Sequence, residues 1–126
     1  MDSRHRLLVV DDEPHNRDLL RRLLQAKYEV EDAGDAEEAI EILEASGDAK
    51  VDLIISDHLM PGKTGAQLAS IVAEKWPGTP FLLLTGYDGD KEVSEAAEKG
   101  FIKEVLSKPW RGRDLRATIA STLDEQ

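Results

Sequence analysis

The sequence predicts an α/β fold in which five parallel strands alternate with five helices. Three apolar runs, Arg6–Val10, Val51–Ser56 and Pro80–Leu84, are too apolar to have a wet face, so they belong inside a sheet that is covered on both sides. A segment with helical spacing of apolar residues follows each run after a short connection. This alternation is typical of βαβ units with right-handed crossovers, and it predicts three layers.

Two weaker strands complete the sheet. Tyr28–Ala33 alternates weakly and has the character of an edge strand, and Phe101–Leu106 contains a last short strand. Five such units favour the flavodoxin-like strand order 2-1-3-4-5, which has its switch point between the first and third strands.

The helices are recognised by their caps and by their apolar positions. Pro14 suits the first turn of the first helix, Asp35 and Thr64 can cap the second and third, and Trp76-Pro77-Gly78 ends the third. We expect the helix over 88–100 to be the most loosely held, because it has few residues to bury. The predicted apolar positions are Leu19, Leu20, Leu23 and Leu24, then Ala36, Ala39, Ile40 and Leu43, then Leu68, Ile71 and Val72, then Val93, Ala96 and Ala97, and finally Leu115, Ile119 and Leu123.

Composition narrows the classes of function. A chain of 126 residues fits a single domain over 1–126, and the absence of cysteine excludes disulfides, thiolate metal sites and a cysteine nucleophile. No apolar stretch reaches membrane-spanning length and the N-terminus lacks the apolar h-region of a signal peptide, so we expect a cytoplasmic protein without membrane contact. The net charge of −10 argues against direct binding of nucleic acid.

Polar residues with useful chemistry follow the predicted strands. Asp11 and Asp12 follow the first strand, Asp57 the third, Thr85 the fourth and Lys108 the fifth. Since ligand sites in open α/β sheets lie at the carboxyl ends of the strands, we expect these side chains to share one crevice.

Three carboxylates in one small site repel one another unless a cation or a proton neutralises them. Oxygen ligands alone select Mg²⁺, or Mn²⁺, over softer metals. Asp57 beside such an ion is a candidate nucleophile that forms an aspartyl phosphate, with the charge of Lys108 and the hydroxyl of Thr85 facing the transferred group. The residues therefore predict phosphoryl transfer onto Asp57.

Each residue alone has a simpler explanation, since acids before a helix usually cap it and a strand-end Asp is usually a turn residue. Gly62-Lys63-Thr64 imitates the end of a P-loop, but that motif requires glycine where Asp57 stands, and no dinucleotide-binding glycine pattern follows the first strand. The scattered histidines, His5, His15 and His58, are expected on the surface; a minority hypothesis is that His58 tunes access to Asp57.

Over essentially its whole length the chain resembles the receiver domains of bacterial two-component response regulators. The resemblance is carried by Asp11-Asp12, by Asp57-x-x-Met60-Pro61-x-x-x-Gly65, by Thr85-Gly86 and by Lys108-Pro109. The sequences around Thr85 and Lys108 look most like those of receivers attached to cyclic-dinucleotide phosphodiesterase or similar output domains.

The resemblance implies that Asp57 receives a phosphoryl group from a histidine kinase or phosphotransfer protein. It implies Mg²⁺ held by Asp12, Asp57 and the main-chain carbonyl of Leu59, with Asp11 acting largely through water. Lys108 and Thr85 would contact the phosphoryl group, and the bond between Lys108 and Pro109 is usually cis in the family.

The same resemblance implies a switch rather than an enzyme acting on external substrates. The face formed by the fourth helix, fifth strand and fifth helix would change, and it could also pair two copies of the domain. Since the chain ends soon after Leu123, we expect no attached output domain, so the domain either docks to an effector or has been excised from a larger protein.

Val105 departs from the family pattern, because receivers often carry Tyr or Phe three residues before the lysine. We therefore expect the signal to travel mainly through the Thr85 loop and the helix over 88–100. Leu59 and Tyr87 are bulky neighbours of the site, which favours slow loss of the phosphoryl group.

Two other classes of function stay open. An aspartate-nucleophile phosphatase typically needs a second acid where Leu59 stands, and a chain this short lacks a substrate cap. A degenerate receiver that acts only as a scaffold would not need to retain the five site residues.

Overall fold

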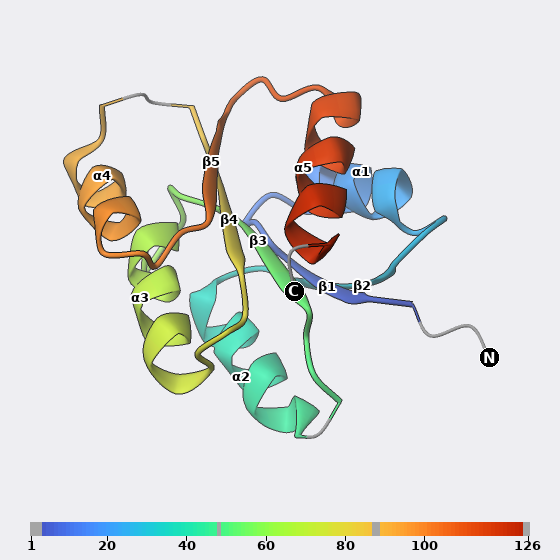
Figure 1. The fold of residues 1–126 in the computed structure, drawn as a ribbon, viewed down its shortest axis with the longest axis horizontal. Helices are drawn as coiled ribbons and strands as arrows, with labels where there is room; N and C mark the ends of the chain where they lie inside the picture. Colours follow the sequence, from blue (N-terminus) through green and yellow to red (C-terminus); the bar gives the residue numbers. More distant parts are fainter. Residues whose placement is uncertain (1–3, 48, 87–88, 125–126) are drawn as a thin grey trace.

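The computed structural model describes residues 4–47, 49–86 and 89–124, and it has the predicted alternation of strands and helices (Figure 1). The strands are β1 (Arg6–Val10), β2 (Glu29–Ala33), β3 (Leu53–Asp57), β4 (Phe81–Thr85) and β5 (Glu104–Ser107). The helices are α1 (Pro14–Leu24), α2 (Ala36–Ser46), α3 (Gly65–Lys75), α4 (Lys91–Glu98) and α5 (Gly112–Asp124).

The strands form one parallel sheet in the order β2-β1-β3-β4-β5, which confirms the predicted order. Every residue of β3 and β4 is buried, as their continuous apolar sequences require. The edge strand β5 is largely exposed, which explains why its sequence gave a weaker signal.

Alternate residues of each central strand enter two separate cores. Leu7, Val9, Leu53 and Ile55 pack on one face with α1 and α5, whereas residues such as Leu8 and Ile54 pack on the other face with α2, α3 and α4. Figure 1 shows the same division of the helices on either side of the sheet. Burial on both faces fixes the register of the strands, and it thereby fixes where each strand ends.

The first predicted helical stripe was wrong at one position. Leu20 and Leu24 are buried on α1, whereas Leu19 is 48% exposed. Four leucines span more of the helix circumference than the sheet can cover. One of them therefore faces outward.

The fourth helix is shorter than the predicted range 88–100. It begins at Lys91 with Asp90 as its N-cap, and Val93 and Ala96 are buried, whereas Ala97 is exposed. Two of the three expected apolar positions are therefore buried, and the expectation that this helix is the most loosely held stays a prediction.

Among the described residues, no helix combines the length and the apolar character needed to cross a membrane.

Candidate functional site

Asp57 is the last residue of β3, and its carboxylate lies at the carboxyl edge of the sheet. The Oδ1 atom accepts hydrogen bonds from Lys108 Nζ at 2.8 Å and from the His58 amide at 2.9 Å. Both donors contact Oδ1, which leaves Oδ2 for another partner. The side chain is 12% exposed, so a small group can approach it although the strand beneath it is buried.

The turn after β3 is unusually tight at Gly65. A Cβ atom at this position would lie 2.4 Å from the Asp57 carbonyl oxygen and 2.9 Å from the His58 Cα. The Gly65 amide donates to the His58 carbonyl at 2.8 Å, so this close approach is part of the turn. Gly65 thereby fixes the main chain directly behind Asp57.

Asp11 and Asp12 follow β1 and face the same edge of the sheet. Asp11 is 2% exposed, and its Oδ1 accepts the Glu13 amide at 2.9 Å, whereas Asp12 is exposed. Arg17 of α1 donates to the Asp11 carbonyl at 2.7 Å and steadies this loop. Glu13 occupies the N-cap position of α1 without a side-chain hydrogen bond, so this helix starts without a side-chain cap.

Three carboxylate oxygens, one from each of Asp11, Asp12 and Asp57, lie within 4.8 Å of one another. Burial raises the pKa of Asp11 above its ordinary value of 3.8, and the charges of Asp57 and Asp12 raise it further, while the Glu13 amide and Lys108 oppose them. Hard divalent cations such as Mg²⁺ prefer this kind of oxygen donor set. The cluster therefore fits the predicted cation.

The other two predicted residues come from neighbouring strand ends. Thr85 ends β4 and is 3% exposed, and its carbonyl accepts the Lys108 amide at 2.8 Å. The bond between Lys108 and Pro109 is cis, as expected. A cavity of about 440 Å³ is lined by Asp11 and Lys108 together with Trp110.

Leu59 lies in the turn after Asp57 with its side chain 67% exposed, and Val105 is 38% exposed on β5. Tyr87, the other expected neighbour of the site, lies outside the described residues.

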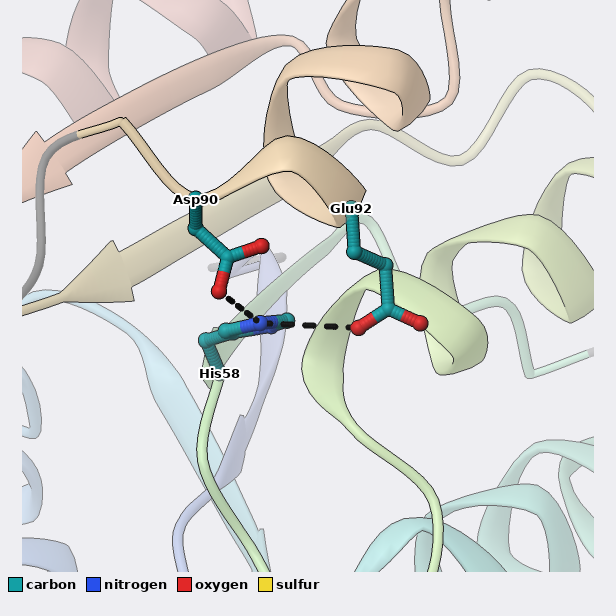
Figure 2. Close-up of side chains that lie close together, drawn as sticks. All are labelled: His58, Asp90 and Glu92. Carbon is teal, nitrogen blue, oxygen red and sulfur yellow. Dashed lines mark ion pairs between the residues drawn. The ribbon is translucent and has the colours of Figure 1, made fainter.

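The expectation of a surface position was wrong for His58, although His5 and His15 are exposed. The His58 side chain is 2% exposed, and it points under the start of α4 toward Asp90 and Glu92 (Figure 2). No local pattern marks this contact, because its partners are more than thirty residues away in the sequence. The only usable signal is that α4 follows β4 and so starts at the edge where β3 ends.

The sequence profile of the response regulator receiver domain matches residues 7–120. The hydrogenase transcriptional regulatory protein HoxA of Cupriavidus necator is 30% identical over 99% of this chain, which spans 25% of that protein. The cyclic di-GMP phosphodiesterase response regulator RpfG of Xanthomonas campestris pv. campestris is 32% identical over 93% of this chain and 31% of its own length. The chain thus spans about a quarter to a third of these relatives.

Solved structures agree with the sequence comparisons. The signal receiver domain of an HD domain-containing protein from Pseudomonas fluorescens Pf-5 has a TM-score of 0.89 and 30% identity, covering 99% of this chain and 90% of that one. The response regulator TrrA of Thermotoga maritima, in complex with Mg²⁺ and BeF, has a TM-score of 0.83 and 30% identity, covering 94% of this chain and 98% of that one. The chain therefore belongs to the response regulator receiver domains, the modules of two-component phosphorelay signalling.

Proposed function

We propose that Asp57 is the phosphoryl acceptor of this receiver domain. One observation carries the proposal: the Asp57 carboxylate accepts a hydrogen bond from Lys108 at 2.8 Å and has a carboxylate oxygen of Asp11 and one of Asp12 within 4.8 Å. A cation held by the acids would act together with the Lys108 ammonium to neutralise the negative oxygens of a phosphoryl group.

The donor is a phosphorylated histidine of a kinase or phosphotransfer protein. An Asp57 carboxylate oxygen forms the new bond to phosphorus while the bond from phosphorus to the imidazole nitrogen breaks. The imidazole leaves with the electron pair of that bond and takes up a proton from water. Lys108 then moves its contact from Asp57 to a phosphoryl oxygen, and the Thr85 hydroxyl donates to another.

Asp12, Asp57 and the Leu59 carbonyl are proposed to hold Mg²⁺, with Asp11 acting largely through water. Bound Mg²⁺ would neutralise charge on the phosphoryl oxygens and on the acids themselves. Mn²⁺ is an equivalent oxygen-seeking ion and is the expected substitute.

The domain is proposed to act in the cytoplasm over 1–126 as one module, and to modify only itself. Its effector is an output domain or a separate protein that reads α4, β5 and α5, and a second copy could pair through the same surface. The exposed Val105 lies on this surface. Because Val105 lacks an aromatic ring, we assign the movement mainly to the Thr85 loop and to α4.

A small phosphodonor tests the proposal. With acetyl phosphate and Mg²⁺, intact mass should show one added phosphoryl group that is lost in Asp57→Asn or with a chelator. Trp110 lies two residues after Lys108, so its fluorescence should change in parallel, with Trp76→Phe removing the background of the second tryptophan. Turnover of unrelated phosphoesters would instead indicate a phosphatase, and the absence of any adduct would indicate a scaffold.

A further inference from the structure

His58 joins the acceptor carboxylate to the start of α4. Its amide donates to Asp57 Oδ1 at 2.9 Å and also to the Leu84 carbonyl at 3.1 Å. Its imidazole is buried and extends from the turn after β3 toward α4 (Figure 2). A single residue thus contacts both the proposed acceptor and a helix that packs on the sheet.

The contacts of the ring determine which nitrogen carries its hydrogen. The Ala66 amide donates to Nδ1 at 3.4 Å, so Nδ1 presents a lone pair. The hydrogen therefore lies on Nε2, which is 3.3 Å from Asp90 Oδ2 and 3.6 Å from Glu92 Oε1. In this tautomer Nε2 faces the two carboxylates as a donor, which argues against reading the three side chains as a metal site.

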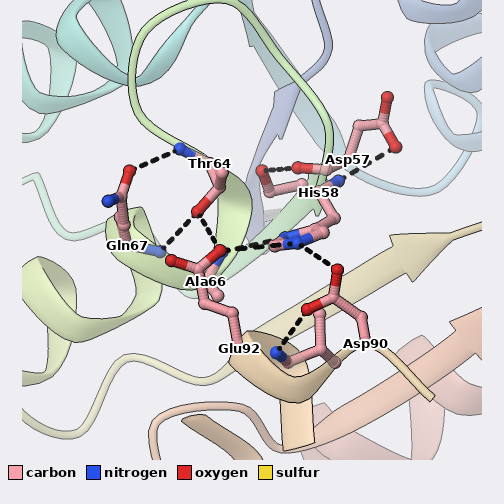
Figure 3. A network of polar contacts seen from close by, with 9 residues as sticks. Asp57, His58, Thr64, Ala66, Gln67, Asp90 and Glu92 are labelled. Atoms are coloured by element: carbon pink, nitrogen blue, oxygen red, sulfur yellow. Dashed lines mark hydrogen bonds and ion pairs between the residues drawn. The ribbon is translucent and has the colours of Figure 1, made fainter. Parts of the chain in front are cut away.

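Both carboxylates also hold the ends of helices (Figure 3). Asp90 caps α4 by accepting the Val93 amide at 3.1 Å, and Glu92 accepts the hydroxyl of Thr64, the N-cap of α3, at 2.9 Å. Donation from the Val93 amide lowers the pKa of Asp90, and His58 contributes to the same shift. The His58 ring therefore lies where the starts of α3 and α4 meet.

We propose that His58 is a positioning residue that holds the start of α4 against the Asp57 turn and releases it when Asp57 is phosphorylated. The release rests on the proposed function. The His58 amide and Lys108 both donate to the charged Asp57 carboxylate. Phosphorylation converts this carboxylate into the uncharged acyl group of an acyl phosphate, which weakens both bonds. Because the His58 amide makes one of these bonds, the turn that carries the ring is then freed, and the contact between the ring and Asp90 is lost.

The reciprocal consequence concerns the affinity for a phosphoryl mimic. A contact that stabilises the unmodified arrangement opposes binding of the mimic, and its removal must favour binding by the same factor. The contact between the His58 ring and the acids at the start of α4 is called the link here. The variant His58→Phe breaks it at a buried side chain, and Glu92→Ala breaks it at a half-exposed one. Glu95→Ala is the matched control, because Glu95 lies on the same helix and pairs with Lys91 instead.

The test combines backbone hydrogen exchange over 91–98 with titration of beryllofluoride in Mg²⁺, read by Trp110 fluorescence. We expect exchange in the unmodified protein to rise about threefold or more in both link variants and to stay unchanged in Glu95→Ala. The mimic should raise exchange in the wild type, add less than about twofold in the link variants, and bind them about threefold more tightly.

If residues 91–98 exchange at the wild-type rate in His58→Phe and Glu92→Ala, then His58 does not hold the start of α4. If exchange is faster in these variants but the mimic still raises it as much as in the wild type, then phosphorylation does not release the contact, and His58 has only a structural role. If the wild type does not bind the mimic, the proposed function fails and the release with it, while the comparison without mimic still decides whether His58 holds α4. Circular dichroism confirms that each variant folds.

Discussion

At Gly65 the requirement of the site is steric. A methyl group there would meet main-chain atoms of Asp57 and His58, which cannot turn aside as a flexible side chain can. We expect Gly65→Ala to lower the free energy of unfolding by about 1–3 kcal/mol or more, because the turn behind Asp57 must shift. Urea unfolding measures the change.

Gly86 provides the matched control for Gly65, since a Cβ there would meet nothing within 4 Å. Gly86→Ala should stay within ~0.5 kcal/mol of the wild type. Equal stability of the two alanine variants would show that the Gly65 turn has room after all.

The buried carboxylate of Asp11 lowers the stability of the folded protein, although it is part of the candidate metal site. Its raised pKa means that folding disfavours its charged form, so at neutral pH the buried charge destabilises the protein without metal. Asp11→Asn removes that charge, and the amide oxygen can still accept the Glu13 amide. We expect this variant to be more stable than the wild type by more than the ~0.5 kcal/mol typical of a neutral substitution. Urea unfolding at pH 7 with a chelator tests this, and a less stable variant would contradict it.

At this scale the sequence predicted which site residues lie together but not every contact that they make. Asp57 and Thr85 could be placed because each ends a strand that is apolar enough to recognise, and Lys108 because it directly follows the weaker last strand. The direction of the His58 ring could not, since it depends on the turn at Gly65 and on where α4 starts. Arg17, which steadies the Asp11 loop, was missed for a similar reason, because the sequence does not show which group an arginine on a polar helix face contacts.

Among the elements, α4 depends on an electrostatic cap. The pKa of Asp90 is lowered below its ordinary value of 3.8, chiefly because it accepts the Val93 amide. A lowered folded pKa stabilises the native state at pH values above 3.8, and this contribution is lost as the pH falls through the folded pKa. Asp90→Asn keeps a capping oxygen without the charge. It should therefore be less stable than the wild type at pH 7, and the gap should narrow below pH 3.8.

Chemical unfolding of both proteins at pH 7 and pH 3 measures that gap, and a gap of constant size would contradict the electrostatic cap.

Element boundaries were predicted best where a cap and a core agreed. Thr64 caps α3 through the Gln67 amide and Asp35 caps α2 through the Glu38 amide, and both helices begin there. The start of α4 was placed too early, because helix propensity in that segment does not reveal which of its acids is the cap. Leu19 was assigned to the core because periodicity alone does not tell how wide a stripe the sheet covers.

For the whole molecule, the strand order followed from the alternation of five strands with five helices, and the place of the site followed from the rule that ligands bind at the carboxyl ends of the strands. The separation of the two cores was implicit in the apolar strands, which need cover on both faces.

Metal binding should appear as added stability of the whole domain. An ion that binds the folded protein alone stabilises it by about 2.7 kcal/mol at a concentration of 100 times its Kd. We expect Mg²⁺ to raise the Tm of the wild type and to have a much smaller effect on Asp57→Asn and Asp11→Asn. K⁺ at equal ionic strength controls for screening, and an equal rise of Tm in all three proteins would indicate that the acids hold no ion.

The central claim is that Asp57, among three neighbouring acids, takes the phosphoryl group. Borohydride reduces an acyl phosphate to the corresponding alcohol, so peptide mass mapping after treatment with acetyl phosphate and Mg²⁺ identifies the modified residue. The account predicts reduction of residue 57 to homoserine, dependent on Mg²⁺. Reduction at Asp11 or Asp12 instead, or at no residue, would contradict it.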